Sequence, residues 1–313
     1  MLPLALQKTA AVEASPVPVT FGTLKPSTPA EETNATRLTA QIDAALAAPA
    51  WPELSPSFDN ILAEGKPDED AGCGNTDIAA GGCVFGTEKP QTAVVLGDST
   101  GITLLPTVRA AMGTDYNVRG MTKAGCVTLD LEILDDRPGF MADCAAFKAA
   151  AIEEINRTKP AIVFITNTSG VFGSLVSNAR GTEAQQEWLM GTARLLEALK
   201  PSGSKLVIVT APPGGKSPAE CATRTSTPRD CMYEVNSNFV ETAAAMQSAA
   251  EAAGAKMIDT RSWFCSSGYC PSFVGNTPVK RDTVHTTKQY AALLVPVFTD
   301  AVAALSSQGT EDS

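Results

Sequence analysis

The stretch that decides the fold is residues 92–101, which reads Thr-Ala-Val-Val-Leu-Gly-Asp-Ser-Thr-Gly. Its first half is a short apolar run that ends at Gly97, as is typical of a strand buried on both faces. Apolar residues at helical spacing follow over residues 102–112. Ser99 therefore lies at a sharp turn from strand to helix, where its hydroxyl is exposed beside backbone N–H groups.

The same alternation of apolar runs and helical patterns continues toward the C-terminus. It predicts strands at residues 116–121, 160–165, 205–210 and 255–259, and helices at residues 143–159, 183–200, 232–253 and 286–305. Continuous apolar strands separated by helices indicate a parallel sheet covered on both faces. We therefore expect an α/β fold, a three-layer α/β/α sandwich of about five parallel strands. Its site should lie at the carboxyl ends of the strands.

Composition and charge exclude several classes of function. The 313 residues contain 24 basic and 34 acidic side chains, which gives a net charge of −10. Such a field repels phosphate backbones and anionic lipid headgroups, so we expect no nucleic acid partner. No apolar stretch of the sequence approaches the ~18–20 residues that a membrane span needs.

The chain has eight cysteines, and they fall into four couples of near neighbours. Each couple encloses a segment that reads as a loop, which favours short-range disulfides, although sequence alone cannot select among ~105 connectivities. Free buried thiols and a metal site are the alternatives, and the spacings with a single histidine do not fit a metal site. Disulfides would indicate an oxidising compartment outside the cytoplasm. The couples are Cys73/Cys83, Cys126/Cys144, Cys221/Cys231 and Cys265/Cys270.

A second chemical motif, Asp282-x-x-His285, comes just before the last predicted helix. The carboxylate can orient the imidazole, whose other nitrogen is then free to take a proton from a serine. Because His285 is the only histidine, any Ser–His mechanism must use it. Taken singly, Ser99 would be read as a helix cap and His285 as a satisfied helix N-terminal residue. Together, at the site edge of the sheet, they favour catalysis.

Other readings of these residues carry less weight. Residues 97–101 match the G-x-S-x-G of α/β-hydrolases, but those enzymes place several strands before the serine and the acid well upstream of the histidine. Lys123 is a candidate base for Ser99 and reads better as an exposed loop cation. Asp98 reads as a turn residue bonded to backbone. Trp263 and Phe264 are candidates for a sugar site, and packing is the more frequent role of such rings.

The sequence resembles the SGNH (GDSL-type) hydrolase superfamily in its Gly97-Asp98-Ser99 and its C-terminal Asp282-x-x-His285. More narrowly, it resembles the extracytoplasmic SGNH domain of cell-envelope O-acyltransferases, where that domain is fused to a membrane-embedded acyltransferase-3 domain. The stretches that carry this narrower likeness are 54–58, 122–126, 263–265, 270–271, 274–276 and 281–282, and the likeness covers about residues 51–307.

This resemblance implies a flavodoxin-like fold and a triad of Ser99 as nucleophile, His285 as base and Asp282 as orienting carboxylate. It also implies an oxyanion hole made by the Ser99 backbone N–H, a glycine after the second strand and an asparagine after the third. Gly125 is the first candidate for the glycine and Gly120 the second. Asn167 stands in the asparagine's place, although the usual Gly-x-Asn-Asp reads Ile-Thr-Asn-Thr over residues 165–168.

The function that the resemblance implies is O-acyl transfer, with acetyl as the expected group, through an acyl-serine to a carbohydrate hydroxyl of an envelope glycan or glycolipid. A carbohydrate esterase with the same triad is the alternative, and a non-catalytic glycan-binding module is the third. The implied partners are an acyl donor presented by a membrane acyltransferase domain and a carbohydrate acceptor, with no cofactor and no metal. The implied location is extracytoplasmic, tethered to the cytoplasmic membrane in a longer protein.

The expected organisation has four parts. Residues 1–50 form a Pro/Ala-rich tether with a short helix at 35–48, and residues 51–90 form an SGNH extension packed on the core. Residues 91–307 form the SGNH catalytic domain, and 308–313 a disordered tail. The opening residues lack the basic segment and the length of a signal peptide, so we expect any export signal, and the natural start, to lie outside this sequence.

Overall fold

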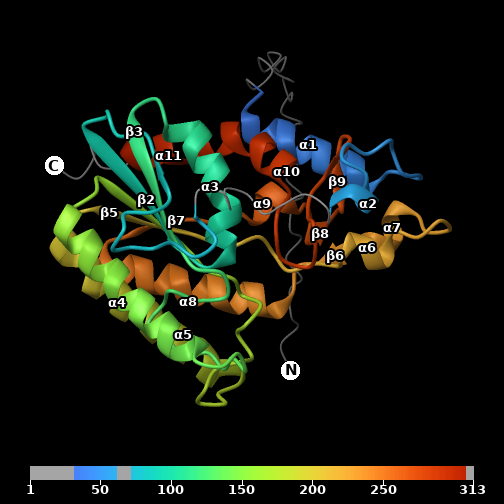
Figure 1. Cartoon of the computed structure of the whole chain (residues 1–313). Coiled ribbons are helices and arrows are strands. Elements are labelled where there is room, and N and C mark those ends of the chain that lie inside the picture. The colour runs from blue at the N-terminus through green and yellow to red at the C-terminus, as the bar shows by residue number, and fades with distance from the viewer. Residues whose placement is uncertain (1–31, 62–71, 308–313) are drawn as a thin grey trace, which may run out of the picture. The chain divides into compact units, whose positions relative to one another are not determined.

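The computed structural model describes residues 32–61 and 72–307 (Figure 1). The chain divides into two compact units, Met1–Glu32 and Thr33–Ser313, and the described residues from Thr33 onward belong to the second. The expected tether up to residue 31 and the tail at 308–313 lie outside the described residues.

A mostly parallel sheet of six strands, in the order β1-β3-β2-β4-β5-β7, forms the centre of this unit. Five of its strands are parallel, as the sequence predicts, and the short β1 adds an antiparallel edge beside β3. β2 lies between β3 and β4, so the chain passes from β2 to β3 on one side and then crosses to β4 on the other side. Such a reversal of strand order leaves a crevice at the carboxyl end of β2. The bounds are β1 Val84–Phe85, β2 Gln91–Gly97, β3 Tyr116–Thr122, β4 Ile162–Thr166, β5 Lys205–Val209 and β7 Lys256–Ile258.

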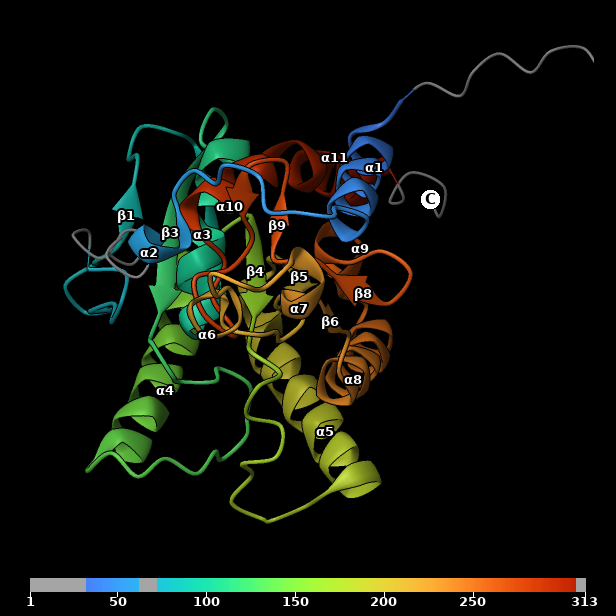
Figure 2. The same cartoon turned by 90° about the vertical axis from the view of Figure 1, so that its right-hand side faces the viewer.

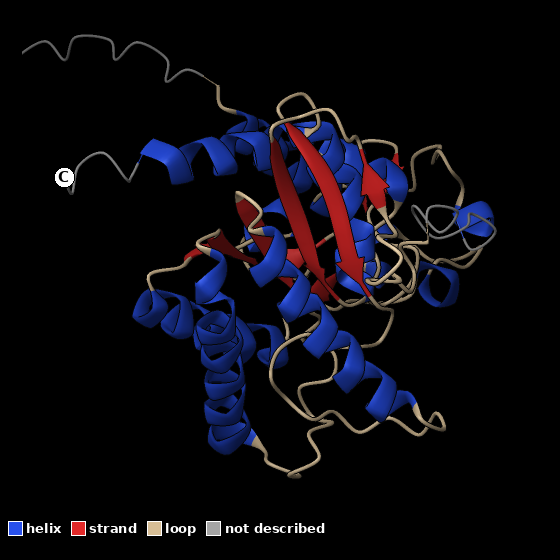
Figure 3. Cartoon of the chain, turned by 60° about the vertical axis from the view of Figure 1, so that its left-hand side comes forward, coloured by secondary structure: helices blue, strands red, loops and turns tan. Residues whose placement is uncertain are grey.

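Helices cover both faces of the sheet and complete an α/β/α sandwich, as Figures 1 and 2 show. In β2, Ala93 and Val95 face one core, and Val94 and Leu96 face the other, so alternate side chains divide between the two layers. Figure 3 shows the strands between the helical layers. One layer contains α3 Ser99–Met112, α10 Lys288–Leu293 and α11 Val295–Ser307, and the other α4 Phe140–Thr158, α5 Gly181–Leu199 and α8 Ser237–Ala253.

Two predicted helices differ most from their expected bounds, and the other helices of the sheet layers lie within about three residues of theirs. The helix expected at 232–253 begins only at Ser237, because Tyr233–Glu234 form a strand, β6, that pairs with β8, Tyr269–Cys270. The Asn236 side chain then caps α8. The helix expected at 286–305 divides into α10 and α11 around Leu294. Pro296 explains this break, since proline lacks the N–H that would continue the helical hydrogen bonds.

The helix that the sequence assigned to the tether instead belongs to the main unit. α1 spans Asn34–Leu46 and buries Leu38 and Ile42 in the same core as β2. Trp51 follows it, packs edge-on against Phe58, and donates from its indole to the Ser226 carbonyl at 2.8 Å. These contacts attach the start of the 51–90 segment to the loop at Ser226, and the packing of the whole segment on the core stays a prediction.

Short elements complete the unit around the ends of the sheet. They include two antiparallel pairs, β9 with β10 and β6 with β8. None of the helices in the described ranges is long and apolar enough to cross a membrane. The bounds are α2 Phe58–Ile61, α6 Pro218–Cys221, α7 Pro228–Cys231, α9 Arg261–Phe264, the 3-10 helix Lys200–Ser202, β6 Tyr233–Glu234, β8 Tyr269–Cys270, β9 Phe273–Val274 and β10 Thr277–Pro278.

All eight cysteines are joined in four disulfides between near neighbours. The structure therefore selects the couples that the spacing favoured, and it leaves no free thiol to bind a metal. Four disulfides fit an extracytoplasmic location, because they form and persist in oxidising compartments. The pairs are Cys73–Cys83, Cys126–Cys144, Cys221–Cys231 and Cys265–Cys270.

Gly97 is required where β2 meets β4. A Cβ at this position would lie 2.4 Å from the Thr166 carbonyl oxygen and 3.3 Å from the Gly101 Cα. Both neighbours are backbone atoms, so a side chain would force the strand and the helix apart.

We predict that Gly97→Ala lowers the free energy of unfolding by about 1–3 kcal/mol, because an added group in a packed core imposes this order of strain. Thermal unfolding would show a melting temperature several degrees lower. Gly173→Ala is the matched control, since its Cβ would meet no atom within 4 Å. Equal melting temperatures for the two variants would contradict the prediction.

Candidate active site

Ser99 is the first residue of α3, and the residue before it fixes where that helix begins. The buried Asp98 carboxylate accepts from the Thr100 N–H at 2.8 Å and the Thr100 hydroxyl at 2.7 Å. Its other oxygen accepts from the Thr168 N–H at 2.8 Å, which ties the helix start to the loop after β4. Burial raises the pKa of Asp98, and these donated hydrogen bonds oppose that effect. The expected turn role of Asp98 is thus a helix cap that also joins two loops.

The structure brings His285 and Asp282 to Ser99 across 186 positions of the chain. His285 Nε2 lies 2.8 Å from the Ser99 Oγ, and its Nδ1 lies 2.7 Å from Asp282 Oδ2. Asp282 Oδ1 accepts from the backbone N–H groups of Val284 and His285 at 2.8 and 2.7 Å. With its proton on Nδ1, the ring donates to Asp282 and accepts from the serine hydroxyl. This is the geometry that activates a serine.

Asp282 is held in its ionised form. Partial burial alone would raise its pKa, but the hydrogen bonds from the His285 ring and the two backbone N–H groups outweigh burial and lower the pKa to about 2. The carboxylate therefore remains charged at every pH at which an imidazole can lose its proton.

Two of the predicted oxyanion donors are backbone N–H groups of residues that line one cleft. Within the described chain, neither the Ser99 N–H nor the Gly125 N–H has a hydrogen-bond acceptor. Gly125 has φ +80°, a conformation that favours glycine, and it lines the same cleft as Ser99. The second candidate, Gly120, is unsuited to the role. Its N–H donates to the Cys83 carbonyl, and its missing side chain makes room for the Cys83 sulfur.

Asn167 lies beside the start of α3, since Thr166 pairs with Gly97 and Thr168 bonds to Asp98. Its Oδ1 accepts from the Thr128 N–H at 2.7 Å and from the Thr128 hydroxyl at 3.0 Å. Its Nδ2 is buried and has no acceptor among the described residues. A buried amide N–H without a partner is costly. Asn167 is not among the residues that line the cleft over Ser99, so its place in an oxyanion hole stays a prediction.

The other candidates lie away from this chemistry. The Lys123 ammonium donates to Asn75 Oδ1 at 2.8 Å, so it makes no dyad with Ser99. Trp263 and Phe264 are buried in the core, where they pack against Phe298 and Tyr290 respectively. Their position fits packing rather than a sugar site.

A cleft of about 320 Å³ opens over the triad, and two arginines help to line it, Arg137 and Arg281. Arg137 lies in a loop with no sequence pattern to mark it, so it was not predicted. Its guanidinium stacks 3.4 Å from the centre of the Phe140 ring and bonds to the Asp135 carboxylate at 2.8 and 2.6 Å.

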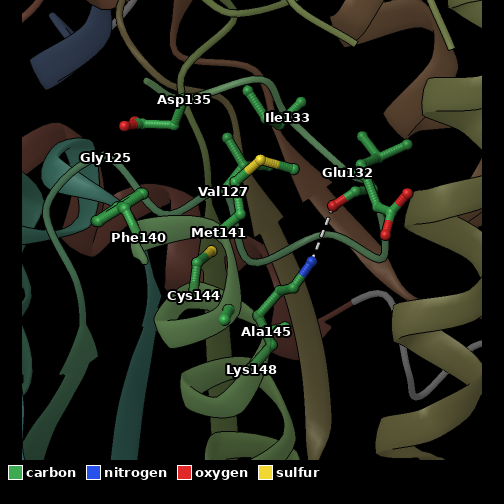
Figure 4. Close-up of a pocket in the computed structure, with 12 residues that line it drawn as sticks. Gly125, Val127, Glu132, Ile133, Asp135, Phe140, Met141, Cys144, Ala145 and Lys148 are labelled. Atoms are coloured by element: carbon green, nitrogen blue, oxygen red, sulfur yellow. Dashed lines mark hydrogen bonds between the residues drawn. The ribbon is translucent and has the colours of Figure 1, made fainter. Parts of the chain in front are cut away.

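A second hollow of about 240 Å³ adjoins this cleft and shares Gly125 with it (Figure 4). Its walls are mostly apolar, with Phe140, Met141 and Val127 among them. Half-buried Lys148 donates to the Leu131 carbonyl at 2.9 Å, the bond dashed in Figure 4. Burial lowers the pKa of this lysine.

A family model described as an SGNH domain fused to AT3 domains matches residues 67–300. The chain belongs to this family. The match covers the sheet, Ser99, Asp282 and His285 together, as the sequence resemblance implied. A search of curated proteins finds no match to this SGNH domain.

Three solved structures are similar to the SGNH domain. The periplasmic domain of the lipopolysaccharide acetyltransferase of Salmonella ser. Paratyphi A has 18% identity and a TM-score of 0.57, over 78% of this chain and 94% of that chain. An aryl esterase of M. Smegmatis has 13% identity and a TM-score of 0.47, over 69% and 100%. A carbohydrate acetylesterase of Sinorhizobium meliloti has 14% identity and a TM-score of 0.44, over 69% of this chain and 100% of that chain. At these identities, the first likeness supports the fold alone.

We predict that Asn167→Ala lowers kcat for p-nitrophenyl acetate by about 10²–10³, the usual effect of removing one oxyanion donor. Asn167→Asp should be equally slow, because it keeps an acceptor for Thr128 and loses the N–H donor. Asn156→Ala is the control, since Asn156 Nδ2 donates to the Ala198 carbonyl far from the cleft. Full activity in Asn167→Asp would assign Asn167 to loop anchoring only.

We predict that Asp282→Asn slows acylation of Ser99 by roughly 10²–10⁴, because an amide no longer fixes the reactive tautomer of the ring. Since the pKa of Asp282 is about 2, its contribution to stability is full above about pH 4 and is lost as the pH falls toward 2. Protonation of Asp282 therefore causes no loss of activity or of stability between pH 7 and about 4. Unfolding measured over this range should show no contribution from Asp282, and one that appears above pH 4 would contradict the prediction.

Proposed function

We propose that the chain is an O-acyltransferase that moves an acetyl group through an acyl-Ser99 intermediate to a hydroxyl of a cell-envelope glycan or glycolipid. The observation that carries the proposal is the hydrogen-bonded series Ser99–His285–Asp282 in a member of a family fused to AT3 domains. Acyl transfer or ester hydrolysis is the chemistry that this geometry supports, and the family favours transfer.

In the proposed first step, the Ser99 oxygen attacks the acyl carbonyl carbon while His285 Nε2 takes the hydroxyl proton. The negative oxygen of the tetrahedral intermediate is stabilised by the N–H groups of Ser99 and Gly125 and the amide of Asn167. The intermediate collapses, and the imidazolium returns its proton to the leaving group of the donor. Asp282 stabilises the imidazolium throughout.

In the second step, a sugar hydroxyl replaces the donor. His285 takes the proton of the sugar hydroxyl while the sugar oxygen attacks the acyl carbon. The Ser99 oxygen then leaves and receives the proton from the imidazolium. Water in the same place would give hydrolysis, so the outcome depends on which nucleophile fills the cleft. The guanidinium groups of Arg137 and Arg281 at the cleft are donors suited to sugar hydroxyls.

The donor and the location follow from the same proposal. A membrane acyltransferase domain, joined to this chain in a longer protein, would present the acyl group on the extracytoplasmic side. The four disulfides support that side of the membrane.

The test uses the chain with p-nitrophenyl acetate as donor, with and without oligosaccharides released from bacterial envelopes. We expect acetylated sugar, detected by mass spectrometry, and labelling of Ser99 by a fluorophosphonate probe. The Ser99→Ala variant should show neither, and Ser169→Ala serves as its matched control at a nearby serine.

Each alternative has its own result. Acetate released at the same rate with every acceptor, and no acetylated sugar, would indicate an esterase. An unlabelled Ser99 in a folded chain that binds oligosaccharide would indicate a binding module.

A further inference from the structure

Asp282 and His285 lie on one short loop whose ends are closed by backbone contacts. Lys280 and Thr286 form an antiparallel bridge, and the Arg281 N–H donates to the His285 carbonyl at 2.9 Å. These contacts close the base of the loop, but its tip at Thr283 extends beyond them. Inside the loop, Asp282 Oδ1 accepts from the Val284 and His285 N–H groups, and the Thr283 carbonyl at the tip is left for contacts from outside the loop.

The Lys280 side chain extends to the Thr283 carbonyl at the tip of the loop. This side chain is buried, with the residue 2% exposed, and its ammonium donates to the carbonyls of Pro213 and Thr283, the latter at 3.3 Å. The Thr283 carbonyl also accepts from the Gly215 N–H at 2.8 Å. Pro213 and Gly215 belong to the loop that follows β5. The ammonium thus joins this sheet loop to the tip that separates Asp282 from His285.

We propose that Lys280 is a positioning residue that holds the Thr283 carbonyl and thereby keeps His285 in reach of the Ser99 hydroxyl. The inference rests on the proposed acylation of Ser99 and assigns a means of control to that same site. A lysine is seldom buried, because an ammonium loses its hydration there. The Lys280 ammonium replaces that hydration with hydrogen bonds to two carbonyls on two different loops.

Two titratable groups of the described chain face the ammonium. Asp282 lies on the same loop, and the Tyr233 ring, from β6, lies 5.6 Å away. Burial lowers the pKa of Lys280 to about 7, against the opposing charge of Asp282. Burial raises the pKa of Tyr233 well above its ordinary value, so the tyrosine stays neutral over the working range. Lys280 is therefore the group whose charge changes near neutral pH behind the triad.

Loss of this charge has opposite effects on reactivity and on stability. A neutral amine donates weaker hydrogen bonds than an ammonium, so above about pH 7 the tip of the loop is held less firmly. The unfolded chain keeps the lysine proton up to a pH of about 10.4, and the folded chain releases it near 7. Stability therefore rises with pH across this interval while reactivity falls. A lysine with a merely structural role would not give this opposition.

The test measures the second-order rate of Ser99 labelling by a fluorophosphonate from pH 5.5 to 8.5, beside the unfolding midpoint in urea. For the natural sequence, we expect the rate to fall roughly five-fold as the pH rises above 7. The urea midpoint should increase over the same upper range. Parallel changes in the two quantities would overturn the proposal without any variant.

Variants give the second arm of the test. Lys280→Met should label roughly ten-fold more slowly at pH 6.5 and show no decline above pH 7, because it has no charge to lose. Lys280→Arg, if folded, should label near the natural rate and also lack the decline, since a guanidinium keeps its proton. Lys205→Met is the matched control. Lys205 is also partly buried, has a lowered pKa and donates to a carbonyl, that of Leu305, at the opposite end of β5.

The possible failures are distinguishable. Unchanged pH profiles in folded Lys280→Met, with Ser99 still labelled, would reject the role of Lys280 and leave the proposed function intact. Absence of labelling at every pH in the natural sequence would reject both. A lost decline in Lys205→Met would show that general destabilisation, rather than the loop, controls the rate.

Discussion

The close approach of β2 and β4 at Gly97 is the constraint on which the site depends. With no side chain at Gly97, the Thr166 carbonyl lies against the strand end, and Asp98 then reaches the Thr168 N–H. The same carboxylate caps α3 at Thr100, so Ser99 is fixed between two strands and a helix. The His285 imidazole, on a loop far along the chain, contacts the Ser99 hydroxyl, whose position is fixed by the sheet and by α3.

The charged groups of the site are paired locally, and unpaired N–H donors remain near the same end of the sheet. Asp282 is satisfied by the His285 ring and two N–H groups, and Lys280 by two carbonyls. Free donors remain on Ser99, Gly125 and Asn167. A folded chain that leaves donors unpaired at one point bears a cost there, and an oxyanion would relieve it.

Local patterns predicted the parts of the fold that depend on local physics. The apolar run before Ser99, the five parallel strands and the sole histidine were sufficient to place the sheet and to bring together the three triad residues. The breaks at Tyr233 and Leu294 needed a strand partner and a proline effect that apolar spacing does not report. Lys280 could not be predicted, because a lysine reads as a surface residue until its buried partners are known. The sequence could not decide between Gly120 and Gly125 as oxyanion donors. The decision needed the position of the Cys83 sulfur, which lies against Gly120.

The disulfides join cysteines only 5 to 18 positions apart, and each pair closes before the next pair begins along the sequence. A chain that enters an oxidising compartment with its N-terminus first would therefore present each cysteine to its native partner before the next pair emerged. Oxidation in order of emergence would give the native pairs without help from a finished sheet. Such a chain has little need of an isomerase to correct mispaired bonds during its maturation.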